Sequence, residues 1–257
     1  MTIETGAPGL RGPALVTGGS RGIGRACALL LAARGADIAL SYIENLEAAE
    51  ATAEEIRGIG RQAIVLQGDA ADADANVALV DGAVEALGPL RYLVCNAANG
   101  TFGTLDELTA ESWDYTMAAH SRALLMLSQR ASVSMRENGG GSIVAISSLG
   151  ARRVYDAYAA FGSAKAALEA LVRYLAVELG PHGINANCVV GGVVLTDLFK
   201  AIPEWRSIAA ASAERAPLRT VLDPEDVAAA AAFLLSPEAH RITGHSLIVD
   251  AGFTLPG

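Results

Sequence analysis

The feature that most constrains the fold is a regular alternation of two kinds of apolar segment along the chain. Short runs rich in β-branched residues are typical of strands, and longer alanine-rich amphipathic runs are typical of helices. The predicted strands are residues 14–17, 37–41, 63–66, 92–95, 142–146, 184–190 and 247–249. The predicted helices are residues 23–34, 45–56, 75–87, 111–137, 158–179 and 224–235. Strands that alternate with helices form βαβ crossovers, and these crossovers build a parallel sheet.

Several of the predicted strands are continuous apolar runs, as expected for strands that helices cover on both faces. We therefore expect an α/β fold with a Rossmann-like, doubly wound parallel sheet of seven strands and helices on both faces. No linker, composition break or internal repeat divides the sequence, which predicts a single domain over residues 1–257. In such a sheet the ligand lies beyond the carboxyl ends of the strands, so binding and catalytic residues are expected in the loops that follow them.

Composition disfavours several other classes of protein. The net charge of -9 argues against nucleic-acid binding, which needs a basic surface. Cys27, Cys95 and Cys188 are widely spaced, which indicates a reducing compartment and gives neither a disulfide framework nor a zinc site. The start of the chain lacks a signal-peptide pattern, and no apolar stretch reaches the ~20 residues of a membrane span. We therefore predict a cytoplasmic protein that binds neither nucleic acid nor membrane.

The loop after the first predicted strand contains three spaced glycines and leads directly into a predicted helix. Glycines let the backbone approach a pyrophosphate, whose charge is stabilised by the N-terminus of the helix. A plain turn shows the same spacing, but the strand before it and the helix after it favour a dinucleotide site. The cofactor-binding residues expected here are Gly18, Ser20, Arg21, Gly22, Ile23 and Gly24.

Residues 17–24, TGGSRGIG, resemble the cofactor loop of the short-chain dehydrogenase/reductase family. Further motifs of that family follow in order along nearly the whole chain, namely QGDA at 67–70, NAA at 96–98, ISS at 146–148, VLT at 194–196 and VDAG at 249–252. The cofactor-binding residues that these motifs imply are Asp69, Ala70, Asn96, Ala97, Val194 and Thr196.

The resemblance also implies a role for each part of this set. Asp69 binds the adenine, and Asn96 shapes the strand end near the ribose. Val194 and Thr196 hold the carboxamide and phosphate end of the cofactor. The alternatives are that Asp69 caps a turn and that Thr196 starts a helix.

The end of the second predicted strand bears on the choice of cofactor. Members of the family that use NAD carry an acid there, whereas this chain has Ser41 and Tyr42. Arg21, expected beside a 2′-phosphate, favours NADPH. Glu44 has the wrong charge for a phosphate unless it points to solvent. We expect NADPH, with Tyr42 in the cofactor site and NADH as the alternative.

The catalytic motif of the family, Tyr-x-x-x-Lys, is altered in this chain. Phe161, which has no hydroxyl, stands four residues before Lys165, and Tyr158 stands seven residues before it. Separations of four and seven residues fall on one face of a helix. We therefore expect the hydroxyl on the face of the lysine, displaced by ~4.5 Å along the helix axis.

This displacement predicts the type of reaction. In ketone reduction the hydride goes to the carbon that bears the oxygen, so the acid lies close to the hydride's target. In an enoyl thioester the hydride goes to the β-carbon, and charge develops on the more distant thioester oxygen. A Tyr-x6-Lys spacing therefore favours conjugate reduction.

The wider sequence closely resembles the enoyl-acyl-carrier-protein reductase III group, the NADPH-using branch with the ordinary TGxxxGIG loop. The resemblance is carried by residues 147–179, 96–100, 113–114 and 191–192. It implies that Tyr158 stabilises the enolate oxygen and that Lys165 binds the nicotinamide ribose and lowers the pKa of the tyrosine. Ser148 assists at the oxygen, with Ser147 as the neighbour that competes for this assignment. Taken singly, a partly buried helix tyrosine and a solvated helix lysine are the alternatives.

One position departs from the family pattern. His120 stands seven residues after Trp113, where the family has an asparagine that holds a water and a helix kink behind the lysine. Imidazole donates and accepts hydrogen bonds, so it either substitutes for the asparagine or marks an altered proton relay, an altered substrate or lost activity. The remaining histidines, His182, His240 and His245, have no spacing typical of a metal site.

These observations predict NADPH-dependent reduction of the trans-2 double bond of an enoyl thioester of acyl carrier protein or CoA, in fatty-acid or specialised-metabolite biosynthesis. The alternatives are a ketoreductase or alcohol dehydrogenase of the same family, and a nucleotide-binding protein with little catalysis. Residues 197–217 are expected to form a mobile substrate lid or a helix packed on the body. The apolar residues of this segment are Leu198, Phe199, Ile202, Trp205 and Ile208. The family's usual assembly through its long central helices predicts a homotetramer.

Overall fold

The computed structural model describes residues 9–200 and 204–255. Within them, seven parallel strands form one sheet in the order β3-β2-β1-β4-β5-β6-β7. The strands are β1 (Gly12–Val16), β2 (Ala36–Tyr42), β3 (Ala63–Gln67), β4 (Tyr92–Cys95), β5 (Gly141–Ser148), β6 (Ile184–Gly191) and β7 (Ser246–Val249). The order reverses at β1, which pairs with β2 on one side and with β4 on the other, so the predicted doubly wound sheet is confirmed.

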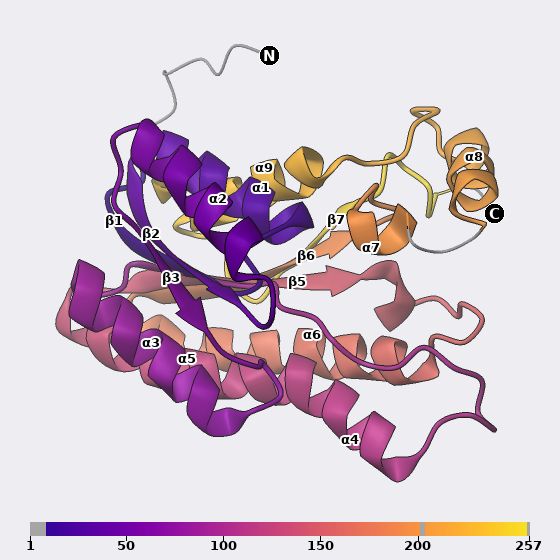
Figure 1. The fold of residues 1–257 in the computed structure, drawn as a ribbon, viewed down its shortest axis with the longest axis horizontal. Helices are drawn as coiled ribbons and strands as arrows, with labels where there is room; N and C mark the ends of the chain where they lie inside the picture. The colour runs from indigo at the N-terminus through magenta and orange to yellow at the C-terminus, as the bar shows by residue number, and fades with distance from the viewer. Residues whose placement is uncertain (1–8, 201–203, 256–257) are drawn as a thin grey trace.

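Helices cover both faces of this sheet (Figure 1). The helices of one face are α1 (Gly22–Ala33), α2 (Leu46–Gly58) and α9 (Pro224–Leu235), and those of the other are α3 (Ala73–Leu87), α5 (Ala123–Glu137) and α6 (Ala159–Leu179). A buried hydrophobic cluster lies under each layer. In β1, Ala14 and Val16 belong to one cluster and Leu15 to the other, because successive side chains of a strand point to opposite faces. This two-sided burial explains the continuous apolar strands of the sequence.

The long helix predicted over residues 111–137 is interrupted. α4 (Ala110–Met117) and α5 are separated by η1 (Ala118–Arg122), a turn of π-helix that contains His120. Such turns widen a helix locally and are frequent at functional sites. The remaining short elements are η2 (Leu149–Ala151), η3 (Gly180–His182), α7 (Asp197–Lys200), α8 (Trp205–Arg215) and η4 (Pro237–Ala239).

The helix predicted from residue 158 begins one residue later. Tyr158 is its N-cap residue, with φ −111° and ψ 9°, and Ala157 before it has a left-handed φ of 55°. The Gly103 amide donates to the Ala157 carbonyl at 2.9 Å, and Gly103 forms an isolated bridge with Tyr158. The tyrosine is therefore held from two sides: its carbonyl accepts from the Gly162 amide of α6 at 2.7 Å, and the Gly103 loop contacts it from outside the helix.

The loops that follow β1, β4, β5 and β6 come together at the carboxyl edge of the sheet. The Thr17 amide donates to the Val94 carbonyl at 3.0 Å, and Ser148 is paired in register with Gly191. Most of the predicted site residues follow these strands, so the fold collects them at one edge. Across the two described ranges, no helix combines the length and apolarity that a membrane crossing requires. Residues 1–8, on which the expectation of no signal peptide partly rests, lie outside those ranges.

Candidate active site

The backbone between β1 and α1 is packed so closely that glycine is required. A Cβ atom on Gly24 would lie 2.1 Å from the Gly18 carbonyl oxygen and 2.5 Å from Nδ2 of Asn96. Gly18 and Gly22 have φ values of 64° and 53°, in the left-handed region that favours glycine. The Asn96 side chain donates to the carbonyls of Thr17 and Gly18 at 3.1 and 3.2 Å. The loop is therefore a fixed backbone cradle.

A cavity of about 370 Å³ opens at the N-terminus of α1. Its lining includes Ser20, Arg21, Gly22, Arg25, Thr196 and Glu225. The first turn of α1 has no acidic residue, and the side chain of its N-cap residue makes no capping hydrogen bond. The helix dipole and the cationic Arg21 favour an anion at the N-terminus of α1, although Asp197 and Glu225 also line the cavity. The cradle and the cavity fit the phosphate-bearing part of a dinucleotide such as NADP(H).

The end of β2 presents no inward-held carboxylate in the described structure. Ser41 is buried, and its Oγ accepts from the Gly18 amide at 3.0 Å, so it supports the loop. Tyr42 is half-buried, and Glu44 is exposed to solvent. Arg21 at the cavity wall is then the charge expected to meet a 2′-phosphate.

Asp69 makes two contacts in the structure. Its Oδ1 accepts from the Ala71 amide at 2.8 Å, which is the turn-capping contact considered as the alternative. Its Oδ2 accepts from the Tyr115 hydroxyl at 3.2 Å, and Nδ2 of Asn99 donates to that hydroxyl at 2.9 Å. The sequence did not single out Tyr115, because it lies 46 residues from Asp69 in the chain.

The other predicted cofactor residues lie along the same edge of the sheet. The Ala97 amide donates to Thr17 Oγ1 at 3.1 Å. Ala70 and Val194 are buried, and Ile23 is packed against the hydrophobic cluster under α1. These contacts are structural, and the cofactor contacts of these residues stay predictions.

The structure distinguishes the two neighbouring serines of β5. The Tyr158 hydroxyl donates to Ser148 Oγ at 3.3 Å, a long hydrogen bond. Ser147 Oγ instead donates to Glu169 at 2.8 Å. Adjacent strand residues point to opposite faces, so the serine that meets the tyrosine is Ser148.

Lys165 is buried on α6, and its Nζ donates to the Ile146 carbonyl at 2.7 Å. Burial lowers its pKa to about 8, because the charged form is poorly solvated. Burial also raises the pKa of Tyr158, and the hydrogen bond with Ser148 opposes this rise. We expected the lysine charge to lower the tyrosine pKa, but the groups that shift it in the structure do not include Lys165.

His120 is buried in η1, and neither ring nitrogen has a hydrogen-bond partner among the described residues. Its ring meets Phe161 edge-on, with centroids 5.0 Å apart. Burial, followed by the charge of Lys165, lowers its pKa to about 2. The Asn99 backbone weakly opposes this shift without reaching hydrogen-bond geometry. The position thus holds a neutral imidazole.

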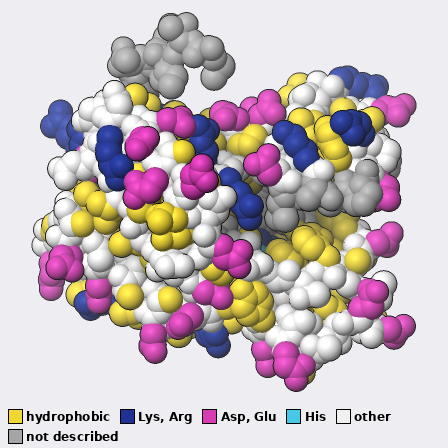
Figure 2. Space-filling view, in the orientation of Figure 1, with side chains coloured by type: hydrophobic (Ala, Val, Ile, Leu, Met, Phe, Trp, Pro, Cys, Tyr) yellow, Lys and Arg dark blue, Asp and Glu magenta, His cyan; other side chains and the backbone are white. Residues whose placement is uncertain are grey.

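Aromatic rings surround the predicted acid. Phe102 and Phe161 stack with centroids 4.4 Å apart, and their centroids lie 5.6 and 5.5 Å from that of Tyr158. Tyr155 meets Tyr158 edge-on at 6.0 Å. We call Phe102, Tyr155, Tyr158 and Phe161 the aromatic wall. Figure 2 shows a hollow between the parts that carry α8 and α4, with hydrophobic side chains gathered at its sides. Phe102 and Tyr155 were not predicted, because they belong to loops without periodicity.

The segment expected to form a lid contains two helices. The Phe199 amide donates to Thr196 Oγ1 at 3.2 Å. Thr196 therefore caps the N-terminus of α7, which is the alternative role predicted for it from the sequence. In α8 the one buried residue among those described is Ser212, and Ile208 is 39% exposed. Of the expected apolar stripe, Ile208 is therefore exposed, Phe199 and Trp205 are half-buried, and the side chain of Leu198 and residue Ile202 lie outside what the structure describes.

The loop of residues 18–24 fits a dinucleotide, the hydroxyls of Tyr158 and Ser148 are hydrogen-bonded, and α6 carries a buried ammonium group that contacts the end of β5. These features define the class of protein as a nucleotide-dependent oxidoreductase. The family model described as enoyl-(acyl carrier protein) reductase matches residues 18–254. The chain belongs to the short-chain dehydrogenase/reductase family and is an NAD(P)-dependent oxidoreductase.

Two curated relatives illustrate the range of the family. The chain is 37% identical over 247 residues to 1-cyclohexenylcarbonyl-CoA reductase of Streptomyces collinus, which covers 94% of this chain and 86% of the relative. It is 36% identical over 242 residues to L-rhamnose 1-dehydrogenase (NAD(P)(+)) of Sphingomonas sp. (strain SKA58), which covers 93% and 94%. Membership therefore establishes the class of enzyme and leaves the particular reaction open.

Two solved structures show the same fold with cofactors bound. A short-chain dehydrogenase from Burkholderia cenocepacia J2315 in complex with NADP matches with a TM-score of 0.87 and 41% identity, over 93% of this chain and 96% of that one. A 7α-hydroxysteroid dehydrogenase complexed with NADH and 7-oxo glycochenodeoxycholic acid matches with a TM-score of 0.90 and 32% identity, over 98% of each. Both forms of nicotinamide cofactor thus occur among the neighbours.

Proposed function

We propose that the protein uses NADPH to reduce the trans-2 double bond of an enoyl thioester carried by CoA or acyl carrier protein. The observation that carries this proposal is the place of the acid. Phe161 stands where the family pattern has tyrosine, and Tyr158 supplies the phenol from the loop before α6, hydrogen-bonded to Ser148. In conjugate reduction, charge develops on an oxygen remote from the carbon that takes the hydride, so a displaced acid suits this reaction.

Each part of the site has a separate role in the proposed reaction. Bound NADPH supplies the hydride. The backbone cradle at residues 18–24 and the N-terminus of α1 hold the pyrophosphate, and Lys165 donates to the hydroxyls of the nicotinamide ribose. Tyr158 and Ser148 donate to the thioester oxygen and stabilise the enolate, after which the α-carbon takes a proton. The aromatic wall limits access of water to the reacting carbons.

One of the curated relatives supports a CoA thioester with a conjugated acyl group. The relative from Streptomyces collinus is named for a CoA thioester whose cyclic alkene is conjugated with the carbonyl. Phe102 and Tyr155 in the aromatic wall are 49% and 37% exposed and offer flat apolar surface beside the acid. Such a surface suits a bulky or cyclic acyl group better than a polar substrate.

We also propose a cytoplasmic homotetramer assembled through α5 and α6. These helices expose apolar side chains that a partner would cover: Val133 is 45% exposed, Tyr174 67% and Val177 75%. α7 and α8 form the substrate lid in this proposal, which the shallow packing of α8 supports.

The test is oxidation of NADPH with crotonyl thioesters of CoA and of acyl carrier protein, set beside the matching acetoacetyl thioesters. Turnover with the crotonyl substrates alone is the expected result. Turnover with the acetoacetyl substrates alone would refute the proposal and establish a ketoreductase, the reaction class of the dehydrogenase relatives. NADPH binding without turnover of either would favour a nucleotide-binding protein with little catalysis.

A further inference from the structure

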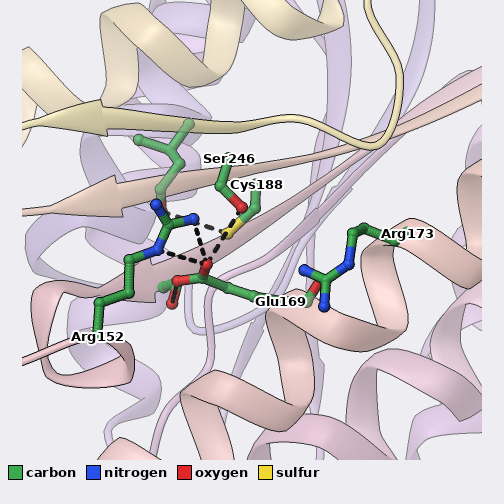
Figure 3. Close-up of polar contacts among 7 residues, drawn as sticks. Arg152, Glu169, Arg173, Cys188 and Ser246 are labelled. Carbon is green, nitrogen blue, oxygen red and sulfur yellow. Dashed lines mark hydrogen bonds and ion pairs between the residues drawn. The ribbon is translucent and has the colours of Figure 1, made fainter.

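A buried carboxylate on α6 joins the segments that carry the proposed catalytic groups. Glu169 lies about one helical turn after Lys165, and its side chain is 6% exposed. It accepts from Ser147 at 2.8 Å. It also accepts from Ser246 at 3.2 Å and from Nε and Nη2 of Arg152 at 3.0 and 2.6 Å (Figure 3). The donors come from β5, from β7 and from the residue that follows η2.

These contacts hold the carboxylate in one orientation. Oε1 is taken by Ser147, and Oε2 is shared by Arg152 and Ser246. The Arg152 side chain is 44% exposed, so the desolvated partner of the ion pair is Glu169. A buried carboxylate without its cation is strongly unfavourable, so the position of Arg152 is tied to that of Glu169.

Arg152 in turn fixes the turn on which the predicted acid rests. Its amide donates to the Leu149 carbonyl at 2.9 Å, which closes η2. The ring of Tyr158 lies directly against η2, because a Cβ atom on Gly150 would be 2.3 Å from Cε1 of the tyrosine. A continuous set of contacts therefore runs from Glu169 through Arg152 and η2 to the Tyr158 ring.

Glu169 also affects the pKa of Lys165 on the same helix. The groups that face Lys165 are Cys95 on β4, Cys188 on β6, His120 in η1 and Glu169 on α6. Cys188 and Cys95 oppose the lowering of the lysine pKa by burial more than Glu169 does. Glu169 is the carboxylate of this set, and it lies four residues after Lys165 on the same face of α6, where its negative charge favours the protonated lysine.

We propose that Glu169 is a positioning residue for the reaction, which fixes the Tyr158 ring through Arg152 and η2 and supports the ammonium group of Lys165. It touches neither substrate nor cofactor. The inference rests on NAD(P)-dependent oxidoreduction and on the proposed roles of Tyr158 and Lys165, and it holds for an enoyl or a carbonyl substrate alike.

The experiment compares three variants of the full-length protein. Glu169→Gln keeps the shape and removes the charge, and Arg152→Lys keeps the charge and removes the paired guanidinium contact. Glu178→Gln is the control, because Glu178 is an exposed carboxylate on the same helix. Each variant is examined for its thermal midpoint, its kcat and KM, and the pH dependence of NADPH binding.

Glu169→Gln is expected to lower kcat by about 10- to 100-fold through misplacement of the acid, with a smaller change in KM. NADPH binding in the wild type is expected to weaken as pH rises through about 8, where Lys165 loses its proton. In Glu169→Gln this midpoint moves to lower pH, because the charge that favoured the ammonium group is gone. Arg152→Lys lowers kcat and leaves the midpoint in place, and Glu178→Gln changes neither.

A lower thermal midpoint in Glu169→Gln with unchanged kcat and unchanged pH midpoint would overturn the proposal and leave the network a purely structural one. If Glu169→Gln does not fold, Arg152→Lys tests the proposal in its place. An unaltered kcat in Arg152→Lys would refute the positioning of Tyr158 through Arg152 and η2. Failure of the proposed enoyl reduction would show in the wild type, whereas failure of this inference shows in the variants alone.

Discussion

The cofactor cradle and the acid-bearing segment of the site are built by different physical means. In residues 18–24, backbone packs on backbone, and a single Cβ atom on Gly24 would lie 2.1 Å from a carbonyl oxygen. In residues 148–158, side chains set the geometry: the phenol of Tyr158 meets Ser148 and is surrounded by rings of the aromatic wall. Geometry made by backbone cannot change without loss of the loop, whereas a side chain carried by a loop can be moved. In this chain the glycine motif keeps the family pattern, whereas the tyrosine is displaced by three residues.

The largest effect is expected at the acid. Tyr158→Phe should lower kcat by about 10²- to 10⁴-fold, because the hydroxyl that stabilises the developing charge is lost. NADPH affinity, measured by fluorescence titration, should change little. Adding Phe161→Tyr to this variant should not restore the rate, because the new hydroxyl is displaced from the oxygen. Full activity in Tyr158→Phe would remove this residue from the mechanism, and residues 148–158 would then no longer be the acid-bearing segment of the site.

The second-largest effect is expected from a substitution in the backbone cradle. Gly24→Ala is expected to cost about 3 kcal/mol in the free energy of unfolding and to abolish NADPH binding, since the added Cβ overlaps backbone atoms that cannot yield. The matched control is Gly58→Ala near the end of α2, where an added Cβ meets nothing within 4 Å. Denaturant unfolding of both variants is the measurement. Equal stability of the two would show that the cradle does not require glycine.

A smaller effect is expected from the charge at the cavity wall. Arg21→Ala should weaken NADPH binding by about 10-fold and leave NADH binding unchanged, because only NADPH carries the 2′-phosphate. Arg57→Ala is the control, since Arg57 near the end of α2 is paired with Glu50 at 3.1 Å and does not line the cavity. Calorimetric titration with both cofactors separates the cases. An equal loss of affinity for NADPH and NADH would contradict the assignment of Arg21.

The smallest effect is a gain in stability at His120. His120→Phe should raise the free energy of unfolding by about 1–2 kcal/mol, because two buried nitrogens without partners are removed. The pKa of His120 is about 2 when folded against 6.5 as the ordinary value, so the unfolded chain binds the extra proton. Wild-type stability should therefore fall as pH drops below about 6.5, and the variant should lose this part of the dependence. Unfolding at several pH values measures both, and a less stable variant would show that the nitrogens are satisfied in solution.

Most of the fold was predictable because burial on both faces leaves a direct mark on the sequence. The strand at Tyr92–Cys95 and the helix at Pro224–Leu235 begin and end where the apolar pattern does. The turn η1 was not predictable, since one extra residue within a helix hardly alters its periodicity. The start of α6 was predicted to within one residue, but the contact between Gly103 and Tyr158 there was not predictable, because it joins loops far apart in the sequence.

The candidate site also has a part that the sequence predicts and a part that only the folded structure shows. The glycines were predictable because a tight turn between a strand and a helix restricts the residue type. The choice between Ser147 and Ser148 needed the direction of each side chain in β5, and the contact between Asp69 and Tyr115 needed the packing of α4. The network around Glu169 joins β5, α6 and β7, and no local pattern marks such a cluster.

The location of Tyr158 ahead of the first turn of α6 has a consequence for how such enzymes diverge. Tyr158 is the N-cap residue of α6, and its carbonyl accepts from the Gly162 amide at 2.7 Å, so its distance from Lys165 is set by the helix and stays the same when the connection before it changes in length. Val154 in that connection is 97% exposed, so length changes meet little resistance from the core. The connection at residues 151–157 can therefore vary to suit different acyl groups while the spacing between the phenol and the lysine, on which the proposed type of reaction depends, is kept.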